Sequence, residues 1–302
     1  VQAEVVPLQV TDGVRTVEAT SASGGLSFGI GDALSASARV GSSPFGPGLP
    51  ADPYTTWSGM VSARLAQGFT AGLETVRAPV TDSFHSFIGT VDANGDVSGR
   101  VRDSWLGVSL SRGWRSGASL GAIGRWGQSD GLLLAPGGTA DGMVPWEQAM
   151  LYGRAPVFSQ GEGSIWLGGE VLYLDHDRQV DAFGPGGAGM FSPDRFYSAM
   201  ARVEGLLGDD PNSNFTACGL FGVGPQVVEG NRTLYLGPGT NLGYELKGSL
   251  AWNLADRWAL VGHLMHQGTW AVWSQTTALA QLRFGRSENT LSAPSANLAS
   301  MV

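Results

Sequence analysis

The stretch that decides the fold reads Ser164-Ile165-Trp166-Leu167-Gly168-Gly169-Glu170-Val171-Leu172-Tyr173-Leu174. Every second residue from Ile165 to Tyr173 is apolar or glycine, whereas the residues between them include Trp166 and Glu170. A period of two predicts a β-strand, because successive side chains of a strand point to opposite faces of the sheet. This strand would have one apolar face and one mixed face.

A long connection, residues 175–194, follows this strand and is polar and rich in Gly and Pro. A second alternating run comes after it, in which Met200, Arg202 and Glu204 share one face, while Ala199 and Val203 share the other. One face of this run carries charge in mid-strand and the other carries none. Two such strands joined by a long loop are typical of a transmembrane β-barrel.

The composition also favours a barrel in an outer membrane over a soluble fold. Of the 302 residues, only 15% are charged, which is low for a soluble globular protein, while 46 are Gly and 10 are Trp. No apolar run approaches the roughly 18 residues that a transmembrane helix needs. The net charge of −8 disfavours a nucleic-acid partner. The single cysteine, Cys218, excludes an internal disulfide and a multi-cysteine metal site.

Short and long connections alternate along the chain. The short ones are tight polar turns near residues 31–32, 67–68, 113–116, 160–163, 209–212 and 255–257, and the long ones span residues 41–53, 78–99, 128–145, 175–194 and 226–239. Outer-membrane barrels have short periplasmic turns and long external loops. We therefore predict an all-β, antiparallel transmembrane barrel of 14–16 strands with its long loops on one side. Residues 1–286 would form the barrel, and residues 287–302 a flexible tail.

Aromatic residues gather near the predicted strand ends, which predicts an interfacial girdle. Packing within loops is the alternative for the same residues. They are Trp57, Phe69, Trp114, Trp126, Trp146, Phe158, Trp258, Trp270 and Trp273.

Three segments go beyond the general barrel pattern. They read Arg77-Ala78-Pro79-Val80-Thr81-Asp82-Ser83-Phe84-His85-Ser86-Phe87-Ile88-Gly89, then Gly187-Ala188-Gly189-Met190-Phe191-Ser192-Pro193-Asp194-Arg195-Phe196-Tyr197-Ser198, and finally residues 243–252, 256–258 and 280–284. In this order they resemble the C-terminal domain of the bacterial cellulose synthase subunit BcsC. The chain departs from that family at Ala78, which separates Arg77 from Pro79, and at Met190, where the family has Tyr.

The resemblance implies a barrel in the bacterial outer membrane that exports cellulose. It also implies 16 strands, which is therefore the favoured count within our range. Its expected partners are the glucan chain, the lipid bilayer with its lipopolysaccharide, and the inner-membrane cellulose synthase complex, reached through a periplasmic scaffold of TPR repeats. This chain does not show the roughly 34-residue helical period of such repeats. No cofactor is expected. The alternative is a general porin or an adhesin-type barrel without a dedicated polymer.

A channel for a neutral glucan needs ring faces on which sugars can stack and polar groups that exchange hydrogen bonds with hydroxyls. The inward set of residues supplies rings at Trp105, Tyr152 and Trp166, and polar groups at Asp103, Arg154 and Glu170. The alternative for the charged residues is that they pair across strands and hold the wall, which would contribute roughly 0.2–1 kcal/mol per pair.

The loops of residues 78–99 and 175–194 contain the first two of the family-like segments. We predict that both loops fold over or into the mouth of the barrel. The candidate gating residues are Asp82, Phe87, Phe191, Pro193 and Arg195.

Enzyme motifs are weakly supported. Residues 25–29 match the hydrolase pattern Gly-x-Ser-x-Gly around Ser27, but their alternation predicts a strand, whereas that motif needs a sharp strand-to-helix turn. Asp175, His176 and Asp177 open a polar loop, where solvated side chains are a better interpretation than a metal or acid–base cluster. We therefore expect a protein that is not an enzyme.

Overall fold

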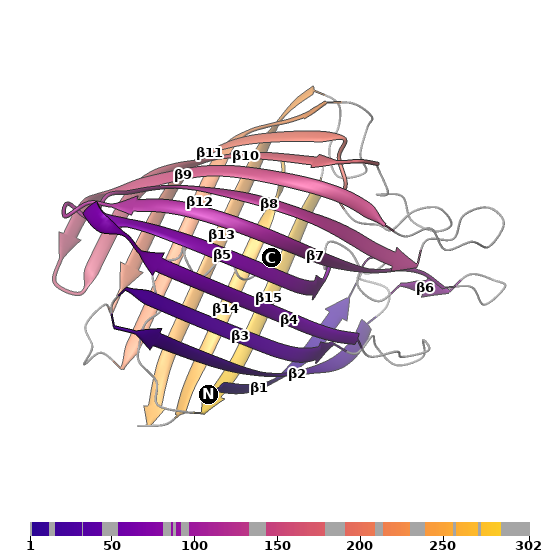
Figure 1. Cartoon of the computed structure of the whole chain (residues 1–302), viewed down its shortest axis with the longest axis horizontal. Coiled ribbons are helices and arrows are strands. Elements are labelled where there is room, and N and C mark those ends of the chain that lie inside the picture. Colours follow the sequence, from indigo (N-terminus) through magenta and orange to yellow (C-terminus); the bar gives the residue numbers. More distant parts are fainter. Residues whose placement is uncertain are drawn as a thin grey trace.

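The computed structural model describes all residues except 1, 12–15, 32, 44–53, 81–85, 87–88, 92–96, 133–142, 179–190, 209–213, 230–238, 256–257, 271–272 and 285–302. Its elements are β1 (Gln2–Thr11), β2 (Thr16–Ile30), β3 (Leu34–Ser43), β4 (Tyr54–Arg64), the 3₁₀ turn η1 (Ala66–Gly68), β5 (Phe69–Pro79), β6 (Thr90–Val91), β7 (Val97–Gly113), β8 (Ser119–Leu132), β9 (Val144–Gln160), β10 (Gly163–His176), β11 (Arg195–Leu207), β12 (Phe215–Glu229), β13 (Gly239–Ala255), β14 (Trp258–Thr269) and β15 (Trp273–Phe284) (Figure 1).

All the long strands belong to one antiparallel sheet in which neighbours in sequence are neighbours in space. The order is β1-β2-β3-β4-β5-β7-β8-β9-β10-β11-β12-β13-β14-β15, and the short β6 pairs only with β7. The predicted all-β antiparallel class is therefore confirmed. The described residues contain fourteen strands along this path, which is the lower end of the predicted range, and the favoured count of 16 is not confirmed.

The long connections leave the sheet at one end, as predicted. Residues 44–53, 80–96, 133–143, 177–194 and 230–238 each join two antiparallel neighbours, and each is separated from the next by a short connection at the opposite end. We call the first the loop end and the second the turn end. The sheet curls, so that Cα atoms of β15 come within 8 Å of Cα atoms of β1, although no backbone pairing joins these two edges among the described strands (Figure 1).

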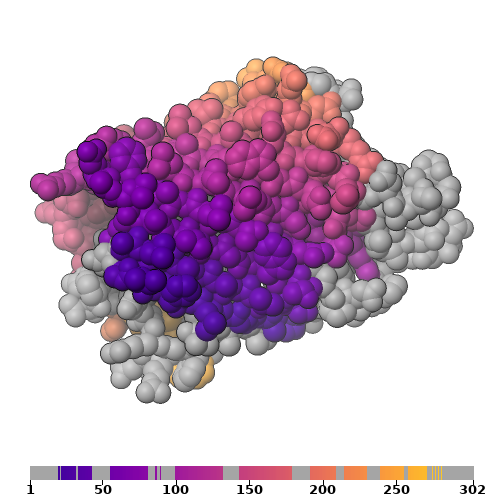
Figure 2. All heavy atoms as spheres, viewed as in Figure 1, coloured from indigo at the N-terminus to yellow at the C-terminus, as the bar shows by residue number. Residues whose placement is uncertain are grey.

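Side chains alternate between a convex outer face and a concave inner face. On β7, Leu106, Val108 and Leu110 are 48%, 44% and 49% exposed, while Trp105, directly before Leu106, faces inward and is half-buried. Rows of exposed aliphatic side chains are unusual on a soluble monomer, but they are the normal covering of a barrel that contacts lipid. Figure 2 shows this outer wall over the N-terminal and middle strands, coloured indigo to pink.

Part of the predicted aromatic set is exposed, as a girdle requires. Trp114, Phe158, Trp258 and Trp270 are exposed at or beside strand ends, whereas Trp126 is exposed in the middle of β8. Trp146 is an exception, because it shares the inner face of β9 with Tyr152, six residues further along the strand. The sequence interpretation of Trp146 as an interfacial residue is wrong, because a strand with a period of two turns all its even-numbered residues to the same side.

The most closely packed part of the molecule lies at the loop end of the inner face. Val101, Val144, Ser86, Ser192 and Pro193 are almost completely buried there. Phe196 and Val228 form a small apolar cluster beside them, against which Leu172, Leu174 and Phe191 pack. None of the helical segments among the described residues is long and apolar enough to cross a membrane.

Candidate functional site

The inner wall carries a band of charged side chains half-way along the strands. We call these residues the charged band: Glu74, Arg125, Arg154, Glu170, Arg202, Glu204, Glu245 and Lys247. Four of them are carboxylates and four are cations, so the band is balanced. Every member has a partner of opposite charge, and all but Lys247 have one on another strand, which agrees with the alternative that these charges pair across strands.

Three ion pairs of the charged band, Arg125–Glu74, Arg154–Glu204 and Arg202–Glu245, join strands that are second neighbours in the sheet. Arg202–Glu170 joins adjacent strands, and Lys247–Glu245 lies within one strand. Arg125 of β8 donates to Glu74 of β5 at 2.6 Å, and to Gln148 of β9 at 3.0 Å. Arg154 of β9 donates to Glu204 of β11 at 2.6 Å, and the Glu204 side chain is only 4% exposed. Because the Arg125–Glu74 and Arg154–Glu204 bonds each pass over an intervening strand, the band ties second neighbours together in addition to the backbone ladder.

Arg202 is the centre of the largest cluster in the band. Its guanidinium donates to Glu170 of β10 on one side and to Glu245 of β13 on the other. Lys247 lies 3.1 Å from the second Glu245 oxygen. The side chains of Arg202, Glu170 and Glu245 are 11%, 13% and 7% exposed, so these are buried charges whose removal from water is offset only by one another.

Glycines on the intervening strands make room for these bridges. Gly107 lies between Glu74 and Arg125, and a Cβ atom there would be 2.7 Å from the Glu74 carboxylate. Gly222 lies between Arg202 and Glu245, and a Cβ atom there would be 2.6 Å from Glu245. A larger residue at either position would block the bridge. The glycines therefore allow long side chains to lie along the wall rather than project from it.

Aromatic rings on the inner face also lie over glycines of a neighbouring strand. A Cβ atom on Gly121 would be 2.5 Å from the Tyr152 ring, and one on Gly127 would be 2.6 Å from the Trp146 indole. Both rings therefore lie over the neighbouring strand β8. A ring that lies over a glycine occupies little of the channel cross-section.

One register row at the loop end gathers three nitrogen-bearing rings. Trp105 pairs with Gly127, Gly127 with Trp146, and Trp146 with His176, so we call these four residues the loop-end row. The Trp105 and Trp146 ring centroids are 6.0 Å apart, and those of Trp146 and His176 are 6.5 Å apart.

Three ring nitrogens of the loop-end row lack a hydrogen-bond partner in the part of the chain that the structure describes. Trp105 Nε1, Trp146 Nε1 and His176 Nδ1 are buried without a hydrogen-bond partner among the described residues. A buried polar group left unpaired costs about 1–3 kcal/mol. Other unpartnered nitrogens belong to arginines, which have several further donors.

All six predicted channel residues lie on the inner face, but not in equivalent surroundings. Trp105 belongs to the loop-end row, and Tyr152 lies over Gly121 of β8. The Arg154 guanidinium lies 4.8 Å from the Trp166 ring centroid, so one face of Trp166 is already covered by a cation. Asp103 accepts a hydrogen bond from Ser129 Oγ. Glu170 and Arg154 belong to the charged band.

Sequence reasoning missed Trp146 and His176 as inner-wall residues. The signal for both was parity, since Trp146 precedes Tyr152 by an even number of residues and His176 follows Trp166 by an even number. His176 is buried against Trp146 rather than solvated, which corrects the solvated-loop interpretation of this residue.

The candidate gating residues are only partly described. Phe191 contacts Phe196 edge to face at 5.2 Å, and the Pro193 carbonyl accepts a hydrogen bond of 3.2 Å from the His176 backbone N–H. Residues 191–193 therefore pack against the inner face of β10 and β11. Arg195 is 57% exposed and lies 3.6 Å from Asp175. Asp82 and Phe87 lie outside the described residues.

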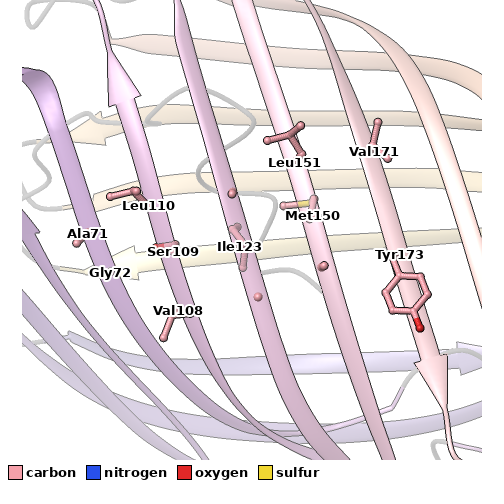
Figure 3. Close-up of a pocket in the computed structure, with 13 residues that line it drawn as sticks. Ala71, Gly72, Val108, Ser109, Leu110, Ile123, Met150, Leu151, Val171 and Tyr173 are labelled. Carbon is pink, nitrogen blue, oxygen red and sulfur yellow. The ribbon is translucent and has the colours of Figure 1, made fainter.

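A hollow of about 800 Å³ crosses β5 and β7 to β10, but it does not belong to the polar inner wall (Figure 3). Its walls include the exposed outward side chains Val108, Leu110, Leu151 and Val171. No member of the charged band lines it. We therefore assign this hollow to the lipid-facing surface and the functional site to the inner wall.

Catalytic and metal chemistry find little support in the described residues. Ser27 lies inside β2, so the strand-to-helix turn of a hydrolase motif does not occur there. No group of three or more His, Cys, Asp or Glu side chains that could hold a metal occurs in the described part of the chain.

A lipid-compatible outer wall around a polar inner wall defines an outer-membrane protein of the barrel class. Among solved structures the chain is similar to a bacterial polysaccharide outer membrane secretin, with a TM-score of 0.56, 10% identity, and coverage of 94% of this chain and 97% of that chain. It is also similar to the beta domain of the Bordetella autotransporter BrkA, with a TM-score of 0.46, 11% identity, and the same two coverages. Of these two structures, the polysaccharide secretin, with the higher TM-score, supports the likeness in fold. Among curated proteins none matches the chain.

The chain belongs to the family of the cellulose synthase operon protein C C-terminus, whose model matches residues 5–205. This match confirms the resemblance to the family, and it includes the first two of the three sequence segments. The protein is therefore located in the outer membrane and is of the polysaccharide-export class.

Proposed function

We propose that the chain forms a channel through which cellulose, an uncharged β-1,4-glucan, passes from the periplasm to the cell surface. The observation that carries this proposal is an inner wall whose charges are balanced and paired, and whose rings lie over glycines. Family membership supports the same substrate.

The physical argument concerns how a long neutral polymer can slide. Coulomb attraction gives an uncharged glucan no grip, and charges that are already paired offer it few strong hydrogen bonds. Ring faces provide apolar contact for the faces of sugar rings without a fixed register. In this proposal Trp105 and Tyr152 are the principal contacts, Trp166 contributes its uncovered face, and Asp103, Arg154 and Glu170 line the path.

The proposed partners follow from the family. They are the inner-membrane cellulose synthase complex, connected by a periplasmic TPR scaffold, and the outer-membrane bilayer with its lipopolysaccharide. The balanced charged band and the net charge of −8 disfavour a nucleic-acid partner. Co-purification tests this connection. The synthase complex should be isolated together with this chain, and deletion of the scaffold should abolish the co-purification.

Glucan secretion by cells that carry ring variants tests the function. We expect Trp105→Ala together with Tyr152→Ala to reduce secreted cellulose severalfold while the protein still assembles in the outer membrane. Glu170→Gln should have a smaller effect, because Arg202 keeps Glu245 as a partner. Normal secretion by the double variant would contradict the proposal. A high, unregulated ion conductance of the wild type, without any dependence on glucan, would favour the general porin.

We also propose that β1 and β15 meet and close the sheet into a barrel. Their Cα atoms approach within 8 Å, and an unpaired edge in a bilayer would leave backbone groups without partners. This closure gives fourteen strands, whereas the sixteen implied by the resemblance would need two further strands between these edges. Pairs of cysteines scanned along β1 and β15 should cross-link in the membrane if the edges meet, and should not if other strands separate them.

A further inference from the structure

The loop-end row differs from every other part of the inner wall that the structure describes. Its three rings come from β7, β9 and β10. Gly127 of β8 has no side chain, and this leaves room for the Trp146 indole beside Trp105. A Cβ atom on Gly127 would also be 2.8 Å from the Ser104 carbonyl, so a larger residue could not be accommodated without a backbone shift. The row is therefore built to hold its rings in this place.

The chemistry of the row matches a sugar unit. Indole and imidazole rings offer apolar faces, and Trp105 Nε1 and Trp146 Nε1 are N–H donors with no acceptor among the described residues. A hexose presents an apolar face of C–H groups and hydroxyl oxygens around its edge. His176 Nδ1 is also without a partner, and the His176 residue is only 6% exposed.

The row is covered at its loop end in this structure. The His176 backbone N–H donates to Pro193, and the Asp177 backbone N–H donates to Pro145 beside Trp146. Ser192 and Pro193 are fully buried, and Phe191 contacts Phe196. Residues 191–193 thus close this end of the wall while the ring nitrogens below them stay unpaired.

We propose that Trp105, Trp146 and His176 form the last sugar-binding subsite of the channel, and that a hexose unit entering it displaces residues 191–193. The inference rests on the proposed export of a glucan. The closed state leaves donors unsatisfied, and the sugar hydroxyls satisfy them. The sugar therefore binds the open state better than the closed one, and this difference in affinity is what shifts the equilibrium.

Single-channel recording of the full chain in planar bilayers, with cellohexaose added on the turn side, tests the subsite. We expect the wild type to open more often as cellohexaose is added. Trp105→Phe with Trp146→Phe keeps both rings but removes both donors, and should raise the half-maximal sugar concentration by roughly tenfold or more. Trp126→Phe is the matched control, because Trp126 is 52% exposed on the outer face, and it should respond like the wild type.

The outcomes separate the subsite from the export function. Equal sugar responses of the wild type and the double Phe variant overturn the subsite. So does a wild type that secretes glucan in cells but does not respond to cellohexaose. A wild type that neither secretes nor responds overturns both proposals.

A measurement on the wild type avoids dependence on the folding of variants. In isotope-labelled protein, cellohexaose should shift two indole N–H resonances, assigned to Trp105 and Trp146. Their failure to move at concentrations that open the channel would overturn the subsite even if no variant folds.

Discussion

The charged band and the loop-end row share strands β8, β9 and β10 of the same wall, yet they differ in how their polar groups are satisfied. In the charged band, every charged side chain has a partner of opposite charge, as Arg202 shows with Glu170 and Glu245. In the loop-end row, the ring nitrogens of Trp105, Trp146 and His176 have no partner among the described residues. The difference is the basis of our proposal that the first region holds the wall and the second binds a ligand.

The largest expected effect comes from opening the centre of the charged band. Arg202→Met leaves Glu170 buried without its cation and removes one partner of Glu245. Loss of one member of a buried pair costs about 3–5 kcal/mol, so we expect a loss of that order in the free energy of unfolding. Urea unfolding of the reconstituted protein, followed by heat-modifiable mobility on gels, measures it.

Arg195→Met is the control for the charged band. Arg195 is 57% exposed, and its carboxylate partners lie at 3.6 and 3.7 Å, so the change should cost less than about 1 kcal/mol. If Arg202→Met unfolds at the same urea concentration as Arg195→Met, the charged band does not hold the wall.

A smaller effect is expected from filling a glycine beneath a bridge. Gly222→Ala places a methyl group 2.6 Å from Glu245, which must move away from Arg202, and overpacking of this kind costs about 1–3 kcal/mol. The control is Gly205→Ala on the adjoining β11, where a Cβ atom meets nothing within 4 Å. Its unfolding free energy should stay unchanged or rise by up to about 1 kcal/mol. Equal losses from the two changes would remove the role assigned to Gly222.

The loop end should respond in channel opening more than in global stability. Phe191→Ala removes the edge contact with Phe196, and such ring pairs contribute about 0.5–1.5 kcal/mol beyond burial. We expect the open probability without sugar to rise by roughly two- to tenfold in single-channel recordings. Phe221→Ala on the outer face of β12, where Phe221 is 49% exposed, should leave it unchanged. An unaltered open probability for Phe191→Ala would argue against gating by residues 191–193.

The smallest expected change in stability is that of Trp146→Phe. The substitution removes an unsatisfied donor, which favours folding, and loses part of a buried ring, which opposes it, so the net change should lie within about 1 kcal/mol. The same urea unfolding measures it. A loss comparable to that of Arg202→Met would show that Trp146 holds the wall rather than a ligand, and would cancel the contrast between the two regions.

The sequence by itself determined the fold class, the two faces of each strand and the side on which the long loops lie. These features are local, because a period of two and the length of a connection can be read within one or two neighbouring strands. The three family-like segments were also local, and the family match over residues 5–205 includes the first two of them. The inward orientation of Trp105, Tyr152 and Trp166 followed from the same alternation.

Only the tertiary structure decided which inward side chains meet. Glu74 and Arg125 are 51 residues apart, and Arg202 and Glu245 are 43 apart, so their contacts depend on the register of three consecutive strands. The glycine beneath each bridge gains its meaning only from that register, as does the row that brings Trp146 and His176 beside Trp105. Register arises from the pairing of whole strands, and a shift by one residue would turn every one of these side chains to the lipid.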